Sequence, residues 1–178
     1  INMTTENISG WDVATDLLDQ QDIAYSFGIC DDIGFEKDIV ERFNVFVYAF
    51  DPTPYSVNWI ADQKLPQNLN FYPWAASGKD GNFFLYPRVN NKGKKSSTMF
   101  TFHEQEKCRD DGIKVEAFSI NSMMKKLGNE KIDILKMDIE GAEYDVIDCM
   151  LDSDIRPKML LIEFHHRFKG IGKQKTCN

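Results

Sequence analysis

Short apolar runs that alternate with stretches of helical periodicity constrain the fold of this chain more than any other feature. Apolar runs of about six residues are typical of strands buried on both faces, as in a parallel sheet covered by helices. Strands that alternate with helices along the chain predict a parallel α/β sheet in three layers. The four clearest runs are Ile23–Gly28, Val45–Phe50, Ile132–Met137 and Met159–Phe164.

The segments between these runs predict the rest of the alternation. Apolar residues recur at helical spacing from Trp11 to Leu18, so we expect a covering helix within residues 1–20. Further helices are expected at Ile33–Phe43, from Pro54 behind its cap Thr53, from the cap Asn121 to Leu127, and at Gly141–Leu151. Further strands are expected at Leu69–Ala75, Asn82–Tyr86 and Ile113–Ile120, and the polar, basic segment Asn90–Thr98 predicts a mobile loop.

Length and charge limit the classes of protein and partner. The 178 residues suit a single domain, with a core at residues 21–164 and a polar tail at residues 165–178. The net charge of −7 argues against a nucleic acid partner, because binding to a phosphate backbone depends on clustered Lys and Arg. No apolar run approaches the roughly 20 residues of a membrane span, and no leader peptide pattern begins the chain. We therefore expect a cytoplasmic protein without a membrane span.

The cysteines give no sign of a metal or redox site. Cys30, Cys108, Cys149 and Cys177 are far apart and match neither a zinc-ligand nor a thioredoxin-like spacing. Free thiols in a reducing compartment are the simplest interpretation, and no metal is predicted.

Three strand ends carry residues that suit a nucleoside ligand. Gly28 follows the first strand, Asp51 the second and Asp138 a later one, and the carboxyl ends of parallel strands meet at one edge of the sheet. Gly28 lets a ligand approach the backbone, and Asp51 can accept hydrogen bonds from both hydroxyls of a ribose. The structural alternatives are a tight turn at Gly28 and a helix cap or turn at Asp51.

The residues after the first strand favour a cationic nucleoside over a dinucleotide. A dinucleotide fingerprint needs two more glycines, where this chain has Cys30 and Ile33. Asp31 and Asp32 would also repel phosphates at the start of the following helix. S-adenosylmethionine, which carries a ribose, an amino group and a sulfonium, fits these residues better than NAD.

Three segments also resemble the FkbM-type methyltransferases. They are Tyr25–Glu36, Val47–Pro54 and Ile132–Glu143, and the last of them, which contains Asp-Ile-Glu-Gly-Ala-Glu, is the most specific. The resemblance runs from about Tyr25 to Phe164. It implies a class I Rossmann-like fold, which is a three-layer α/β/α sandwich with a mostly parallel sheet. It also implies S-adenosylmethionine as cofactor and O-methylation as the commonest activity.

Carried over residue by residue, the resemblance implies a cofactor site at these strand ends. The methionine side would lie against Ser26, Phe27, Gly28, Ile29, Cys30 and Asp32, the ribose against Asp51 and Pro52, the adenine near Ala76 and Ser77, and the sulfonium near Asp138. Cys30 stands where the family usually has glycine. Its side chain is therefore expected to crowd the cofactor.

Methyl transfer to a hydroxyl needs alignment of the reactants and a group that accepts the proton. Asp138, Glu140 and His165 are the candidate bases, His165 because its ordinary pKa of about 6.5 suits neutral pH. The alternative for Glu140 and Glu143 is that they start a helix, where the dipole favours carboxylates. The alternative for His165 is a polar residue that leaves the sheet.

Charged and aromatic residues near these positions lead to two further predictions. Lys136 and Glu163 interrupt otherwise apolar strands two residues before Asp138 and His165, so we expect an ion pair between them that braces both. A second set either walls a substrate pocket or belongs to the core: Phe100, Phe102 and His103.

The sequence therefore predicts an S-adenosylmethionine-dependent O-methyltransferase that acts on a sugar or another small hydroxylated acceptor. Two alternatives stay open: a catalytically silent Rossmann-like binding or assembly module, and a nucleotide-cofactor oxidoreductase, which the missing glycines disfavour. The residues after Phe164 are too few for the further helix and C-terminal hairpin that the family implies. We therefore expect an uncovered strand edge and self-association through it.

Overall fold

Five parallel strands form the central sheet of the computed structural model, which describes residues 3–90, 92–104 and 106–166. Their order across the sheet is β11–β10–β3–β4–β5, and all neighbouring pairs are parallel. The strands span Ile23–Phe27 (β3), Phe46–Phe50 (β4), Leu69–Tyr72 (β5), Ile134–Met137 (β10) and Met159–Ile162 (β11). The first strand of this sheet thus lies in its middle. The parallel sheet predicted from the sequence is confirmed.

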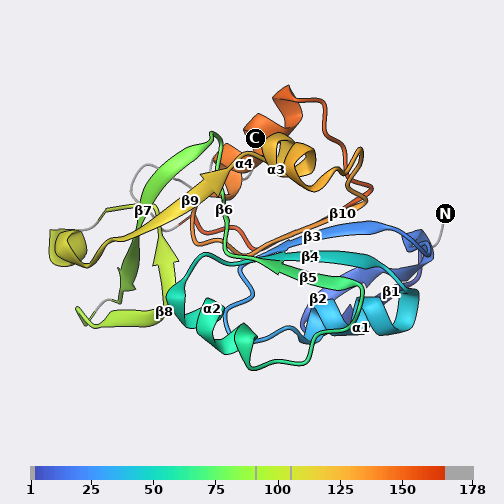
Figure 1. Cartoon of the computed structure of the whole chain (residues 1–178), viewed down its shortest axis with the longest axis horizontal. Coiled ribbons are helices and arrows are strands. Elements are labelled where there is room, and N and C mark those ends of the chain that lie inside the picture. The colour runs from blue at the N-terminus through green and yellow to red at the C-terminus, as the bar shows by residue number, and fades with distance from the viewer. Residues whose placement is uncertain (1–2, 91, 105, 167–178) are drawn as a thin grey trace.

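Helices cover the two faces of the central sheet (Figure 1). One face packs against α1 (Gly34–Phe43) and α2 (Pro54–Ala61), and the other against α3 (Ile120–Leu127) and α4 (Glu143–Asp152). Successive strand residues alternate between the two cores, so that Ile134 faces α1 and Leu135 faces α3 and α4. Among the described residues, none of the helices has the length and apolar character needed to cross a membrane.

A second sheet of four strands lies beyond one end of the central sheet (Figure 1). Its order is β6–β9–β7–β8, with β6 parallel to β9 and the other two pairs antiparallel. The strands span Ala75–Ala76 (β6), Gly81–Val89 (β7), Lys95–Thr101 (β8) and Ile113–Phe118 (β9), and the 3-10 helix η2 (Glu106–Asp111) joins β8 to β9. The sequence predicted two of these strands but no separate sheet.

The helix ends agree with the capping signals in the sequence, with one correction. The hydroxyl of Thr53 accepts a hydrogen bond from the backbone N–H of Ser56, and Pro54 opens α2, as predicted. The cap of α3 is Ser119 and not Asn121, because the Ser119 hydroxyl accepts from the N–H of Ser122. Gly128 ends α3 in the left-handed region, with φ at +71°.

The predicted N-terminal helix is wrong, and a β-hairpin stands in its place. β1 (Thr5–Ile8) and β2 (Trp11–Ala14) pair antiparallel, and the 3-10 helix η1 (Thr15–Leu17) follows. Ser9 and Gly10 both have positive φ, +46° and +89°, which is the backbone of a two-residue hairpin turn. Ile8 and Val13 still join the core on the α1 side of the central sheet, so the segment covers part of the sheet as a hairpin instead of a helix.

The segment predicted as a loop at Asn90–Thr98 is a strand in its second half. β8 begins at Lys95 and pairs with β7, with Pro87 opposite Phe100 and Tyr86 opposite Thr101. The alternating burial of β8 explains why its composition reads as polar, since every second side chain faces solvent. Only the turn that precedes Lys95 keeps the predicted loop character.

The strand predicted at Leu69–Ala75 is two strands that belong to different sheets. β5 ends at Tyr72 in the central sheet, and β6 begins at Ala75 beside β9 in the second sheet. Pro73 lies between them and has no N–H to donate to a neighbouring strand, so the pairing ends there. The chain passes from one sheet to the other at this proline.

The expected Lys136–Glu163 ion pair is wrong, because Lys136 pairs with Glu36 of α1. The Nζ of Lys136 lies 3.3 Å from Oε1 of Glu36, and both side chains are buried. Glu36 also accepts a hydrogen bond from the hydroxyl of Ser26. The rings of Trp11 and Phe35 lie 5.1 and 5.6 Å from Nζ, within cation–π range. A lysine in an apolar strand thus finds its partner on the helix below the sheet.

Candidate functional site

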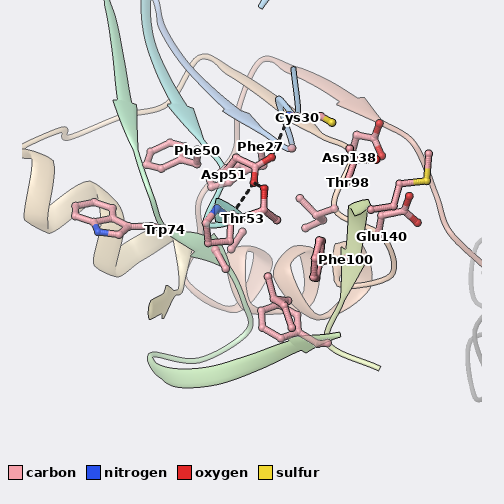
Figure 2. A pocket seen from close by; sticks show the side chains of 18 residues that line it. Phe27, Cys30, Phe50, Asp51, Thr53, Trp74, Thr98, Phe100, Asp138 and Glu140 are labelled. Atoms are coloured by element: carbon pink, nitrogen blue, oxygen red, sulfur yellow. Dashed lines mark hydrogen bonds between the residues drawn. The ribbon is translucent and has the colours of Figure 1, made fainter. Parts of the chain in front are cut away.

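A cavity opens at the carboxyl ends of β3, β4 and β10, where the strand order of the central sheet reverses. Ligands of open α/β sheets bind at this switch point. The second sheet forms the opposite wall (Figure 2). The cavity is lined by Phe27, Gly28, Cys30, Phe50, Asp51, Pro52, Thr53, Trp74, Ala75, Ala76, Leu85, Thr98, Met99, Phe100, Phe102, Asp138, Ile139 and Glu140.

Gly28 joins two strand ends at the floor of the cavity. Its φ is +78°, and a Cβ placed on it would lie 1.9 Å from the carbonyl oxygen of Asp138. The backbone N–H of Asp138 donates to the carbonyl of Phe27 at 3.1 Å, which holds the two segments together. Only glycine permits this approach. The tight turn weighed for Gly28 is therefore real, and the residue also borders the cavity.

Asp51 is held by the backbone around it. Its Oδ2 accepts from the N–H of Cys30 at 3.0 Å, and its Oδ1 accepts from the N–H and the hydroxyl of Thr53 at 2.9 and 2.6 Å. A carboxylate offers about four acceptor positions, so these three bonds leave one. Dashed lines in Figure 2 mark hydrogen bonds of Asp51 with Cys30 and Thr53. Thr53 is a lining residue that sequence reasoning treated only as a helix cap.

Cys30 adopts a conformation that usually belongs to glycine. Its φ is +50°, and the residue borders the cavity next to Asp51. Burial, together with the negative charge of Asp31, raises the pKa of the Cys30 thiol to about 11. The thiol is therefore protonated at neutral pH and does not act as a nucleophile.

Asp138 lies on the cavity wall in strongly acidic surroundings. Burial and the charge of Glu163 raise its pKa to about 6, while His165 lowers it in part. None of the hydrogen bonds among the described residues ends on its carboxylate. The Nε2 of His165 lies 3.7 Å from its Oδ1.

His165 lies behind this wall rather than on it. The residue is 5% exposed, and its Nδ1 is 2.8 Å from Oε1 of Glu143. Burial alone would lower the pKa of His165, but the bond with Glu143 and the charges of Glu140 and Asp138 outweigh burial and raise it. A raised pKa argues against His165 as a proton acceptor near neutrality. Glu143 is fully buried, as a partner of His165 and of the N–H of Gly141.

Glu140 is bound by a residue that the sequence did not single out. Arg88 of β7 places one guanidinium nitrogen 2.6 and 2.7 Å from the two carboxylate oxygens of Glu140. Glu140 has a φ of +55°, and strained backbone of this kind clusters at functional sites. An arginine in a strand was the available signal, but its partner lies 52 residues away in sequence.

The remaining predicted site residues divide between the cavity and its surroundings. Phe27, Pro52 and Ala76 line the cavity, as do Phe100 and Phe102. Four lie elsewhere: Ser26 is buried against Glu36, Ile29 belongs to the core, Asp32 accepts from the N–H of Gly34, and Ser77 borders a second hollow. His103 also lines that second hollow. Leu85 of β7 and Thr98 and Met99 of β8 also line the cavity and were missed, because the sequence did not predict that β7 and β8 form a second sheet that faces it.

Together these residues give the cavity one apolar and one acidic side. The apolar side carries aromatic rings from both sheets, such as Phe50, Trp74 and Phe100 in Figure 2. The acidic side carries Asp138 and Glu140, and among the described lining residues there is no Lys or Arg. The cavity therefore suits a flat, apolar group joined to a positively charged one.

The comparison with family models decides the family. The Methyltransferase FkbM domain matches residues 22–174. This chain belongs to the FkbM methyltransferase family. The match contains all three segments on which the resemblance rests, together with both sides of the cavity.

Membership of the FkbM family gives the general activity, which is methyl transfer. Searches of curated proteins and of solved structures find no match for the chain. The identity of the cofactor and of the acceptor therefore has to be inferred from the geometry of the cavity.

Proposed function

We propose that this FkbM-family chain is an S-adenosylmethionine-dependent O-methyltransferase with a class I, Rossmann-like α/β/α fold. One observation carries the proposal: Gly28, Asp51 and Asp138, chosen from three separate strand ends, border a single cavity at the switch point of the sheet. The strand order supports the fold, because the first strand is central and the order reverses beside it.

The donor set of the cavity fits this cofactor. The aromatic residues Phe50 and Trp74, with Ala76, would take the adenine, and the last acceptor position of Asp51 would take one ribose hydroxyl. Phe27 and Cys30 would border the methionine part, and Asp138 would lie near the sulfonium. The absence of Lys and Arg from the described lining residues disfavours a dinucleotide, whose phosphates need positive partners.

When bound, the cofactor supplies an electrophilic methyl group. The residues of the chain do the rest: the cavity walls exclude water and hold the acceptor in line, which lowers the entropic part of the barrier. Asp138 is the lining carboxylate without a hydrogen bond from the described residues, so it is placed to orient the acceptor hydroxyl and accept its proton. Glu140 is already paired with Arg88 and keeps the wall in shape.

The acceptor is proposed to be a small hydroxylated molecule, such as a sugar. The aromatic rings of the second sheet, Phe100 and Phe102, offer flat surfaces for a ring of carbons and hydrogens. This part of the proposal follows the family resemblance more than the geometry. It is tested by offering the enzyme panels of sugars and of phenols with labelled cofactor and measuring label transfer.

Calorimetry tests the cofactor directly. Titrations with S-adenosylhomocysteine and with NAD are carried out on the wild type, on Asp51→Asn and on a control, Asp62→Asn. Asp62 is an exposed residue at the C-terminal end of α2. We expect S-adenosylhomocysteine alone to bind, and Asp51→Asn to weaken it at least about ten-fold, or about 1.4 kcal/mol. Binding of NAD instead would favour an oxidoreductase, and binding of neither would favour a silent module.

A further inference from the structure

A compact group of metal-ligating side chains lies behind the acidic wall of the cavity. One ligand atom each from Asp138, Glu163 and His165 lie within 4.8 Å of one another. Bonds of about 2.2 Å to one ion place neighbouring ligands about 3 Å apart at right angles and about 4.4 Å apart when opposite. The three side chains therefore need only small rotations to close on an ion.

The ring of His165 is held so that one nitrogen faces the other two members of the group. The residue is 5% exposed, and its Nδ1 is fixed by Glu143 at 2.8 Å. Its Nε2 makes no hydrogen bond with the described residues and faces the carboxylates of Asp138 and Glu163 at 3.7 and 3.6 Å. A histidine whose other ring nitrogen is held by a carboxylate is the usual form of a metal ligand, because the outer carboxylate fixes the tautomer and the ring orientation.

Neighbouring carboxylates are already engaged, which leaves this triad as the ligand set. Glu140 lies 3.4 Å from Nε2 of His165, but both of its oxygens are bound to Arg88. Glu143 has one oxygen on Nδ1 of His165, and its Oε2 is buried without a hydrogen-bond partner among the residues that the structure describes. Glu163 is the exposed member, so an ion can enter from solvent on its side.

We propose that Asp138, Glu163 and His165 bind a divalent transition-metal cation beside the cavity. Two carboxylates and one imidazole suit Mn²⁺, Fe²⁺ or Zn²⁺ better than Mg²⁺ or Ca²⁺, which prefer oxygen ligands alone. The site offers three protein ligands, of which Asp138 also lines the cavity, and three ligands leave further coordination positions on the ion, as in sites that act on substrates.

The role of this cation, but not its binding, rests on the proposed function. A cation next to Asp138 would bind the oxygen of the acceptor hydroxyl and favour loss of its proton. The O–H bond would break with its proton passing to solvent on the side of Glu163, and the oxygen would keep the electron pair. That pair would form the O–C bond to the methyl group while the carbon–sulfur bond breaks, and its electrons would leave on the sulfur of S-adenosylhomocysteine. With the cation bound, Asp138 would be one of its ligands, and the cation rather than Asp138 would activate the acceptor hydroxyl.

Electron paramagnetic resonance with MnCl₂ tests the binding without cofactor or acceptor. Free Mn²⁺ gives a strong signal that falls when the ion binds, so a titration yields the affinity and the number of sites. We expect one site in the wild type, at least about ten-fold weaker affinity in Glu163→Gln, and unchanged affinity in the control Glu41→Gln, an exposed carboxylate on α1. Absence of a saturable site, or equal affinity in Glu163→Gln and Glu41→Gln, would overturn the proposal.

Nitrogen coupling tests the part of His165. We expect spin-echo spectra of the bound Mn²⁺ to show coupling to an imidazole nitrogen in the wild type and to lose it in His165→Gln, whose folding is checked by circular dichroism. Coupling that persists in folded His165→Gln would contradict the assigned ligand set. Because all these measurements omit the cofactor, their failure leaves the binding of S-adenosylhomocysteine, and with it the proposed function, as it was.

Discussion

Two charged groups lie two residues apart and have opposite surroundings: Lys136 is buried on β10, and the half-buried Asp138 follows the end of that strand. Lys136 faces α1, where it pairs with one carboxylate, that of Glu36, and the two side chains are 7% and 1% exposed. The hydroxyl of Ser26 and the ring of Trp11 complete the contacts. Charge is balanced one to one within this buried pair. Such a pair stabilises one arrangement of sheet and helix.

Asp138 has the reverse of this balance. Glu140 and Glu163 lie near it, and one imidazole, that of His165, lies 3.4 to 3.7 Å from the three carboxylates. Burial and then the charge of Glu163 raise the pKa of Asp138, whereas the pKa of His165 is raised, against the effect of burial, by its bond with Glu143 and by the neighbouring carboxylates. The difference teaches that burial of charge alone does not mark a site. The cluster around Asp138, unlike the Lys136 pair, borders a cavity that can hold a ligand.

Removal of the balanced lysine is expected to have the largest effect. Lys136→Met leaves Glu36 buried without a counter-ion, so we expect the free energy of unfolding to fall by about 3–5 kcal/mol. Asp138→Asn removes repulsion instead and is expected to change it by less than about 1 kcal/mol. Urea denaturation followed by circular dichroism measures both. The double variant Lys136→Met/Glu36→Gln is expected to recover part of the loss. Equal losses of stability in Lys136→Met and Asp138→Asn would show that the two charged groups do not differ in their contribution to stability.

The contact that holds Asp138 in place gives the next largest effect. In Gly28→Ala the new Cβ meets the carbonyl of Asp138, so we expect a loss of about 3 kcal/mol in the free energy of unfolding. Gly128→Ala is the matched control, because its φ is +71° and a Cβ there meets nothing within 4 Å. The control is expected to lose only about 1 kcal/mol. Equal losses would mean that backbone conformation, and not contact with Asp138, decides the requirement at Gly28.

Much of this architecture could be predicted from local signals. The apolar runs gave β3, β4, β10 and β11 because strands buried on both faces have few other compositions. Gly28, Asp51 and Asp138 were predicted to meet because the ends of parallel strands share an edge, and all three do border the cavity. Local sequence patterns, namely apolar runs and the residues that end them, were therefore enough to place these residues in the parallel sheet.

The failures have in common that a partner distant in sequence decides the outcome. Lys136 was expected to pair with Glu163, which follows the neighbouring strand, but its partner is Glu36 of α1. No pattern in β10 specifies which residue of that helix faces Lys136. Arg88 reaches Glu140 from the second sheet, which was not foreseen as a sheet. The second strand of the hairpin, Trp11–Ala14, was interpreted as part of a helix because the five apolar residues among Trp11–Leu18 recur at helical spacing. A side-chain partner that comes from another layer of the fold is not specified by the local sequence pattern, so only the three-dimensional structure reveals it.

Ligand charge offers a sharper probe of the acidic cluster than stability does. S-adenosylmethionine and S-adenosylhomocysteine differ by one methyl group and one positive charge. We expect Asp138→Asn to weaken S-adenosylmethionine about ten-fold, or about 1.4 kcal/mol, and S-adenosylhomocysteine less than about two-fold, because only the former loses a charge interaction. Calorimetry with both ligands in the presence of a chelator measures this ratio. Equal weakening of both ligands would show that Asp138 acts through shape and not through charge.

Cys30 sharpens the comparison from the other wall, and we expect the smallest effect there. Its backbone N–H helps to hold Asp51, while its side chain points from a left-handed backbone at the border of the cavity. Cys30→Gly relaxes this backbone and removes the side chain, so we expect S-adenosylhomocysteine to bind about three-fold tighter, or about 0.7 kcal/mol. Cys30→Ala keeps the Cβ and is expected to show a smaller gain. Calorimetry that finds Cys30→Gly no tighter than the wild type would mean that the sulfur does not crowd the ligand, and the acidic wall would then be the main determinant of affinity.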